Sequence, residues 1–202
     1  MANRTLIADL EFIRREGETH KQSKWCLNNP LMKLINHDFV EHLDAFLNEY
    51  VDCYSQFKVS VKSGSSGSWS KVVYIAFLDK KISRSLTGYT PSLGIYPIIL
   101  ISPDCKHFYF AYMVAVGLKT EKELNKIVSN IRDKMEFPGY SLDTSSMELG
   151  EDKHNYRVAT ICFKELIPEQ YTSDEQLGDE IKALFEIHNR FIETGIPYTI
   201  RL

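Results

Sequence analysis

The 202-residue sequence has few cysteines and no long hydrophobic run. The four cysteines are widely spaced and form no Cys-x-x-Cys pair, which argues against a zinc site and a disulfide framework; they are Cys26, Cys53, Cys105 and Cys162. No apolar stretch approaches the roughly 20 residues of a membrane-spanning helix. The first residues mix acidic and basic side chains and lack the apolar segment of a signal peptide. We therefore expect a reduced, cytoplasmic protein with no membrane partner.

Motifs of common catalytic sites are also missing. There is no GxxxxGKS or GxxxxGKT loop, no GxGxxG, no HExxH and no HxE followed by PCxxC. The six histidines are dispersed, so we expect no metal site. A nuclease would have to combine Asp104 with Glu180 and Lys182, but these fall in a predicted turn and a predicted helix rather than on adjacent strands. The sequence favours a recognition domain without catalytic residues or cofactor, and keeps a nuclease with degenerate motifs as an alternative.

Charge is unevenly distributed along the chain. The formal net charge is −3, which argues against a uniformly basic nucleic-acid-binding protein. Residues 56–132, however, contain eleven basic and four acidic side chains, a net charge of +7 that leaves −10 for the two flanks together. This asymmetry indicates either an anionic partner for the middle of the chain or an ordinary solvated surface.

Hydrophobic periodicity predicts helices at residues 3–16, 38–54, 120–135 and 173–193. Their expected N-caps are Asn3 or Thr5, Asp38, Thr120, and Ser173 or Asp174, and Glu41 and Glu123 would complete capping boxes. Apolar and alternating runs predict strands at residues 57–62, 72–78, 94–102, 107–117 and 156–164. The order ααββββαβα predicts an α+β fold, with a mostly antiparallel central sheet flanked by helices.

The Ser/Gly-rich stretch SGSSGS, residues 63–68, lies between two strands that should pair. We therefore interpret it as an exposed hairpin finger rather than a tether between domains. Tyrosines follow on successive strands at positions 74, 96, 109 and 112, where aromatic rings can stack on an unpaired base or pack in the core. For Phe77, Phe108 and Phe110 we expect core packing. The polar loop 79–92 is long enough to have a function of its own.

Three segments together resemble a known family. KSGSSGSWSKVVYIAFL, GIYPIILI and FYFAYMVAVGL are similar to the N-terminal DNA-binding domain of McrB-type modified-cytosine restriction proteins. The resemblance covers roughly residues 40–193, so we expect an N-terminal helical extension at 1–37 and the DNA-binding domain at 38–202. It implies a non-catalytic domain that binds duplex DNA and flips a methylated cytosine into an aromatic pocket. It also implies a GTPase motor domain in the same parent chain and a separate endonuclease subunit.

The resemblance assigns roles residue by residue. Tyr96 and Leu100 match the pocket strand, and Tyr74 stands where the family usually has tryptophan, as a stacking wall. Tyr156 is the candidate for a second stacking aromatic. The finger comprises Gly64, Ser65, Ser66, Gly67, Ser68 and Trp69. Ser66 takes the position where a bulky wedge is expected, so Trp69 either replaces the wedge or anchors the finger to the sheet, and its place just before the strand of Tyr74 favours the anchor.

Basic residues around the finger and the pocket strands are the candidate phosphate contacts: Lys58, Lys62, Lys71, Lys80, Lys81 and Arg84. Phosphate contacts should supply most of the affinity. One buried methyl group adds only about 1 kcal/mol, so selectivity for 5-methylcytosine depends on the shape of the pocket. The missing bulky wedge keeps a second interpretation open, namely a domain that binds another modified base, single-stranded nucleic acid or a protein partner.

Overall fold

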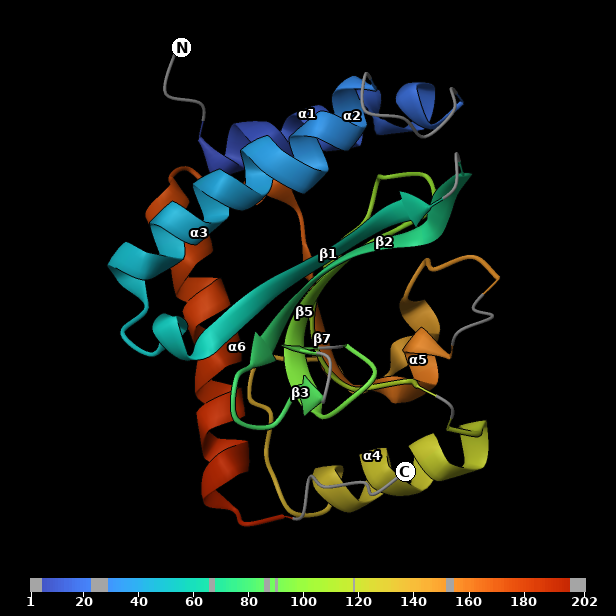
Figure 1. The fold of residues 1–202 in the computed structure, drawn as a ribbon, viewed down its shortest axis with the longest axis vertical. Coiled ribbons are helices and arrows are strands. Elements are labelled where there is room, and N and C mark those ends of the chain that lie inside the picture. The colour runs from blue at the N-terminus through green and yellow to red at the C-terminus, as the bar shows by residue number, and fades with distance from the viewer. Residues whose placement is uncertain are drawn as a thin grey trace.

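The computed structural model of the chain describes residues 5–22, 29–65, 68–85, 88–89, 91–117, 119–151 and 155–196. A five-stranded sheet, in the order β1-β2-β5-β6-β7, forms its centre, and every neighbouring pair is antiparallel (Figure 1). The strands are β1 (Phe57–Ser65), β2 (Ser68–Asp79), β5 (Ile95–Ile101), β6 (Phe108–Val114) and β7 (Thr160–Leu166). A short hairpin of β3 (Arg84–Ser85) and β4 (Gly88–Tyr89) lies within the polar loop. The predicted α+β fold is confirmed.

Longer helices pack on both faces of the sheet. They are α1 (Leu6–Lys21), α3 (Phe39–Tyr50), α4 (Glu121–Arg132) and α6 (Asp174–Glu193), and the short ones are α2 (Pro30–Lys33) and α5 (Tyr156–Ala159). A π-helical turn, Leu34–Asp38, joins α2 to α3, and 3-10 turns lie at Tyr54–Gln56, Thr144–Ser146 and Pro168–Gln170. The predicted caps Thr5 and Ser173 and the capping box of Thr120 with Glu123 are confirmed.

Two predictions about local structure are wrong. The second helical segment begins at Pro30 rather than Asp38, because the Asn29 side chain accepts hydrogen bonds from the Leu31 and Met32 N–H groups and a proline occupies the first helical position. Asp38 forms no capping hydrogen bond. The predicted strand 156–164 begins as a helix, and its strand part starts only at Thr160.

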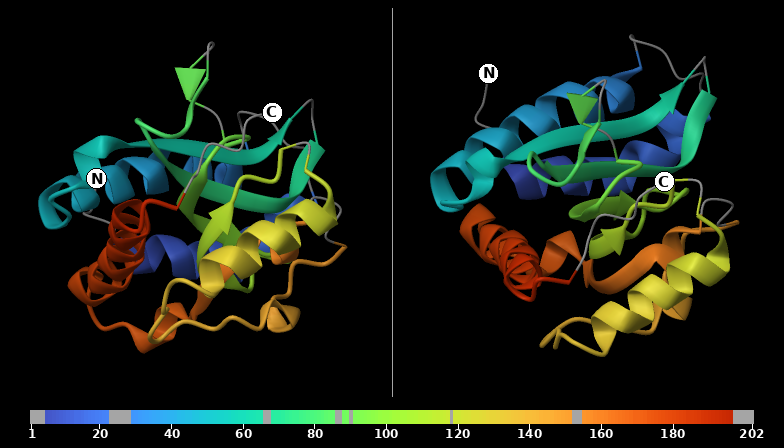
Figure 2. Two further views of the ribbon diagram at one scale, coloured as in Figure 1. Left: turned by 90° about the horizontal axis from the view of Figure 1, so that it is seen from below. Right: turned by 60° about the horizontal axis from the view of Figure 1, so that its bottom comes forward.

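Side chains alternate between the two faces of the sheet, and helices lie on both faces (Figures 1 and 2). One face meets α6: the rings of Phe77 and Phe185 lie 5.2 Å apart, and those of Tyr112 and His188 lie 5.8 Å apart. The opposite face bears Tyr74 and is covered by the segment that includes α5. Phe77, Phe108 and Phe110 are buried, as expected for core residues.

A buried polar chain fixes α6 to the end of β2. His188 Nε2 lies 3.0 Å from Asp79 Oδ2, and His188 Nδ1 lies 3.2 Å from the Tyr112 hydroxyl. The same Asp79 carboxylate accepts a 2.6 Å hydrogen bond from the Lys81 N–H group. Burial alone would raise the pKa of Asp79, but the hydrogen bonds from His188 and Lys81 outweigh it and hold this pKa below its usual value.

The N-terminal helix shares the core with the rest of the chain. Leu6, Leu10 and Ile13 of α1 are buried in the same hydrophobic cluster as the strands. The Leu6 and Ile7 N–H groups donate to the Asp174 carboxylate, at 2.9 and 3.1 Å, so the first residue of α6 caps the first turn of α1. The division of the chain at residue 37 stays a prediction. Of the helices that the structure describes, none is long and apolar enough to cross a membrane.

Candidate nucleic-acid interface

The hairpin of β1 and β2 carries the finger predicted from the sequence. Lys62 pairs with Tyr74, the register shifts between Lys62 and Gly64, and pairing resumes with Gly64 opposite Trp69 and Ser65 opposite Ser68. Between these two pairs β1 advances by two residues and β2 by five, so the irregularity lies in residues 70–73 of β2. Ser66 and Gly67, and the Ser65 side chain, lie outside the described part of the chain. The hairpin therefore extends to the Ser/Gly stretch, with Trp69 near its tip.

Tyr74, Leu100 and Tyr156 come together over one face of the sheet. Tyr74 lies directly opposite Leu100 in the β2–β5 register, which places the two side chains on the same face. The Tyr156 ring of α5 covers this position, 6.4 Å from the Tyr74 ring and inclined to it by 60°. Tyr74 and Tyr156 are 8% and 7% exposed, and Leu100 is 0% exposed. Each wall of this cluster is buried in the free protein.

Tyr96 lies deeper on the same face of the sheet. It is four residues from Leu100 along β5, and its hydroxyl donates a 2.6 Å hydrogen bond to the Pro91 carbonyl. Burial raises the pKa of Tyr96 well above its usual value, and the tyrosines at 74 and 156 add to the rise. Burial also raises the pKa of Tyr74. These hydroxyls are therefore neutral at physiological pH, and Tyr96 supports the Pro91 loop from inside the core.

A cavity of about 240 Å³ opens beside the hairpin. It is lined by two lysines, two serines, one valine and two aromatic residues. They are Lys62, Lys71, Ser68, Ser70, Val72, Trp69 and Tyr156. The volume is below the roughly 300–1,000 Å³ of sites for drug-sized ligands, so it suits one flat ring. This lining combines surfaces for stacking with groups that attract a phosphate.

Two larger hollows lie elsewhere. One of about 530 Å³ is lined by Tyr140 and α6, and one of about 510 Å³ is lined by α1, Lys106 and Glu169. In the second, the cations have carboxylate partners: Arg14 with Glu169, Arg15 with Glu16, and Lys106 with Glu18. Neither hollow is lined by a finger residue, so the smaller cavity is the better candidate for a nucleic-acid contact.

The predicted phosphate contacts separate into two groups. Lys58 and Lys62 are exposed on β1, an edge strand, in register with Leu78 and Tyr74, and therefore point to the face of the tyrosine cluster. Lys71 is exposed on β2, where its Nζ lies 2.8 Å from Glu151 Oε2. The second group lies at the far end of β2, where Lys58 is also placed by its pairing with Leu78. There Lys80 Nζ donates to the Ser55 carbonyl at 2.6 Å, and Lys81 follows it. The Arg84 side chain lies outside the described part of the chain.

Two residues near the hairpin were not predicted. The Asn36 side chain, in the π-helical turn, donates to Ser63 Oγ at 2.8 Å and accepts from it at 3.1 Å, so it holds β1 where its register with β2 shifts. Glu151 pairs with Lys71 from a segment 80 residues away. Neither residue belongs to a periodic pattern or a motif.

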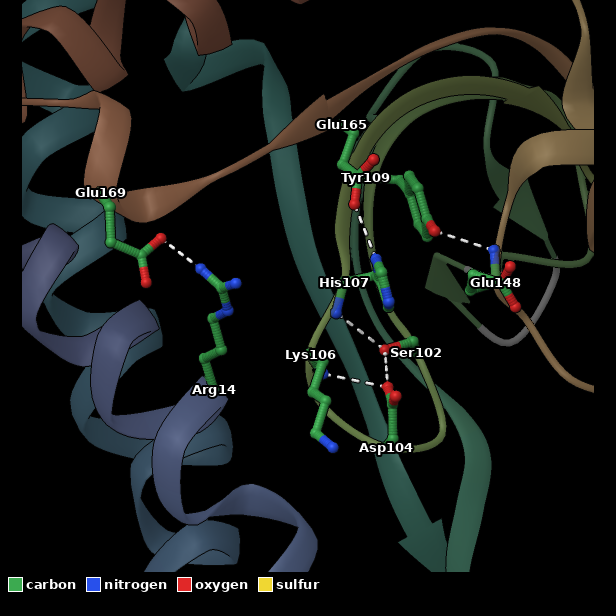
Figure 3. Close-up of polar contacts among 9 residues, drawn as sticks. All are labelled: Arg14, Ser102, Asp104, Lys106, His107, Tyr109, Glu148, Glu165 and Glu169. Carbon is green, nitrogen blue, oxygen red and sulfur yellow. Dashed lines mark hydrogen bonds and ion pairs between the residues drawn. The ribbon is translucent and has the colours of Figure 1, made fainter.

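The acidic residues of the nuclease alternative have structural partners, and Figure 3 shows those of Asp104. Asp104 Oδ1 accepts hydrogen bonds from the Ser102 hydroxyl at 2.5 Å and the Lys106 N–H at 3.0 Å, which closes the β5–β6 turn. Nearby, Glu165 contacts His107 Nδ1 at 2.7 Å, and Glu180 pairs with Lys164. Among the described residues, no three histidine, cysteine, aspartate or glutamate side chains gather closely enough to hold a metal ion.

A protein-family model matches most of the chain. The family described as MrcB-like, N-terminal domain matches residues 13–193, which is most of the chain and includes the hairpin, the tyrosine cluster and α6. No curated protein matches the chain.

Proposed function

The chain belongs to the MrcB-like N-terminal domain family of non-catalytic, DNA-binding domains of restriction systems, and from this premise we propose that it recognises a modified cytosine in duplex DNA by base flipping. The flipped base enters between Tyr74 and Tyr156, above Leu100. Lys62 and Lys71 hold phosphates beside the flipped nucleotide, and Lys58, four residues from Lys62 along β1, holds a more distant one.

The observation that carries the proposal is the position of the tyrosine pair beside the basic hairpin. Tyr156 lines the same cavity as Lys62 and Lys71, and its ring contacts Tyr74. Aromatic partners stack at centroid distances of about 4.5–7 Å, so a base between the two rings needs more than the present 6.4 Å. The base therefore enters by turning Tyr156, on its short helix α5, away from the sheet.

Energetics set what this pocket has to provide. Flipping costs a few kcal/mol of pairing and stacking, and each base–aromatic stack returns about 1–3 kcal/mol. The side chain of Leu100 gives the pocket an apolar floor, against which one cytosine methyl group contributes about 0.8 kcal/mol. Stacking and phosphate contacts therefore supply affinity, and the close fit of the pocket supplies selectivity.

A panel of duplexes tests this function. Binding is measured at one fixed salt concentration to duplexes that differ only in one base: cytosine, 5-methylcytosine, 5-hydroxymethylcytosine or N4-methylcytosine. We expect one modified duplex to bind more tightly than the unmodified one, and both to weaken steeply with salt. Equal affinity for all four duplexes would overturn recognition of the modification. Competition by a single strand of the same sequence distinguishes duplex binding from single-strand binding.

The biological setting forms part of the proposal. As a domain without catalytic residues or cofactor, it delivers a recognised site to a GTPase motor domain in the same parent chain and to a separate endonuclease subunit, in the cytoplasm. Incubation of this chain alone with modified plasmid and Mg²⁺ should leave the plasmid intact. Cleavage by the chain alone would restore the nuclease alternative.

A further inference from the structure

One ion pair crosses from the hairpin to the segment that precedes Tyr156. Lys71 Nζ on β2 and Glu151 Oε2 lie 2.8 Å apart, with side chains that are 57% and 70% exposed. Lys71 also lines the cavity that contains Trp69 and Tyr156. The Glu151 carboxylate is therefore bound to a lysine at the edge of the proposed DNA site.

A carboxylate and a DNA phosphate bind an ammonium group in the same way, through an anionic oxygen at hydrogen-bond distance. With Glu151 in place, the charge of Lys71 is partly compensated, although both side chains stay largely exposed to water. A phosphate that approaches Lys71 has to displace this carboxylate, and it then lies beside an uncompensated negative charge. The exposed pair is weak enough for this exchange, since such pairs contribute little to stability in water.

We propose that Glu151 is an autoinhibitory residue that competes with a DNA phosphate for Lys71. The inference rests on the proposed function, because it concerns the same DNA site. Glu151 lowers the affinity for every duplex, modified or not, and it reduces the contribution that Lys71 makes to the salt dependence of binding. This competition removes part of the binding free energy of the phosphate contacts, so these contacts alone hold the domain on DNA less strongly. Recognition of the base has to supply the missing free energy.

Neutralising the carboxylate tests the competition. In Glu151→Gln the side chain keeps its size and loses its charge, and we expect duplex affinity to rise by about two- to fivefold, the range of an exposed ion pair. The plot of log affinity against log salt should become steeper by up to about 0.9, the value of one additional phosphate contact. Both changes should be equal for modified and unmodified duplexes.

Two matched variants separate this effect from a general change in charge. Glu148 is an exposed acid in the same segment, and no ion pair between it and Lys71 is described. Glu148→Gln should therefore raise the duplex affinity less than Glu151→Gln does. In a Lys71→Ala background, Glu151→Gln should have no greater effect than Glu148→Gln. Because both glutamates are exposed, the melting temperature of each variant should match that of the parent protein.

The outcomes distinguish the two proposals. If the parent protein binds duplex DNA and Glu151→Gln binds it equally well, or if Glu148→Gln and Glu151→Gln raise the affinity by the same factor, the competition is wrong and the proposed function stands. An undiminished Glu151→Gln effect in the Lys71→Ala background also overturns the competition. If the parent protein binds no duplex even at low salt, the proposed function fails and takes this inference with it.

Discussion

The ring of Tyr156 lies 6.4 Å from the ring of Tyr74 and is inclined to it by 60°. This edge contact joins β2, which continues into the hairpin, to α5, a helix of only four residues. A base stacked on both rings has to separate them. Since Tyr74 belongs to a central strand and Tyr156 to a short connecting helix, Tyr156 is the side chain expected to move.

Tyr156→Ala should remove one stacking wall of the pocket. We expect the affinity for the modified duplex to fall by about 1–3 kcal/mol, the usual contribution of one base–aromatic stack. The affinity for the unmodified duplex should change less, because phosphate contacts supply most of it. Fluorescence anisotropy with both duplexes at one salt concentration measures the difference.

The control for this variant is Tyr156→Phe, which keeps the ring and should keep the preference for the modified duplex. Tyr96→Ala is a poorer test of the pocket, because Tyr96 lies on a central strand, is 2% exposed and donates to the Pro91 carbonyl, so its loss costs about 3–5 kcal/mol of stability. Tyr156 is also buried, at 7% exposed, so the melting temperature of Tyr156→Ala is measured together with its binding. If Tyr156→Ala keeps the full preference at an unchanged melting temperature, the flipped base does not stack on this residue.

Local signals in the sequence predicted much of the fold. Thr120 and Glu123 form both hydrogen bonds of the capping box, since this motif depends on residues three positions apart. The predicted start at Asp38 is wrong because the competing cap, Asn29, lies nine residues earlier in a stretch without clear periodicity. At Tyr156 the pattern predicted a strand, but the chain forms a helical turn there. The Thr160 hydroxyl donates to the Tyr156 carbonyl across this turn, and the Arg157 guanidinium donates to the Met147 carbonyl.

The candidate site was predictable only where it follows strand pairing. Tyr74 and Leu100 lie on neighbouring strands, so their contact follows from the antiparallel order of the sheet. The ion pair of Lys71 with Glu151 leaves no pattern in the sequence, because it joins exposed residues that are 80 positions apart. Such contacts depend on how the loops cover the sheet, which no local propensity determines.

Lys62→Ala combined with Lys71→Ala should weaken binding to all duplexes by the same factor. Each lysine that contacts a phosphate contributes about 0.9 to the slope of log affinity against log salt, so the double variant should lower this slope by up to about 1.8. Titrations at several salt concentrations measure it. Lys182→Ala, an exposed lysine on α6, is the control and should leave both slope and affinity unchanged. A loss restricted to the modified duplex would contradict a role in phosphate binding.

Stability should depend on Asp79 at acidic pH. The pKa of Asp79 is lowered in the folded state, so its ionised form stabilises the fold above its usual pKa of 3.8, and this contribution is lost as pH falls through the lower folded-state value. Asp79→Asn should reduce the free energy of unfolding by about 1–3 kcal/mol at neutral pH, by weakening the bond to His188. It should also flatten the loss of stability below about pH 4.

Urea denaturation between pH 3 and pH 7 measures both effects of Asp79→Asn. Glu186→Gln, an exposed acid on α6, serves as the control and should follow the parent protein at neutral pH. An Asp79→Asn protein as stable as its parent at pH 7 would show that the contact with His188 does not stabilise the fold.

Asp174→Ala should uncouple α1 from α6. The Leu6 and Ile7 N–H groups lose their acceptor, and loss of a helix cap costs about 0.5–2 kcal/mol. Thermal denaturation measures the change. Glu175, the other acid in the first turn of α6, is the control, and Glu175→Ala should lower the free energy of unfolding by less.

Deletion of residues 1–37 should destabilise the protein further, because it uncovers the surface buried by Leu10 and Ile13. An unchanged melting temperature after this deletion would identify residues 1–37 as a dispensable extension.

Trp69→Ala separates an anchor from a wedge. Trp69 is half-buried and packs against the core, so we expect the variant to melt at a lower temperature and to bind modified and unmodified duplexes more weakly in parallel. A wedge would behave differently: the melting temperature would stay unchanged, while the fluorescence of 2-aminopurine next to the target cytosine would no longer rise on binding.

Ser66, which lies outside the described residues, takes the position of the expected wedge, so Ser66→Trp should increase this fluorescence. The same substitution at Ser68 is the control, because it adds equal bulk two residues along the hairpin. If only Trp69→Ala abolishes the signal and the fold is intact, the tryptophan has taken over the wedge role that serine cannot fill.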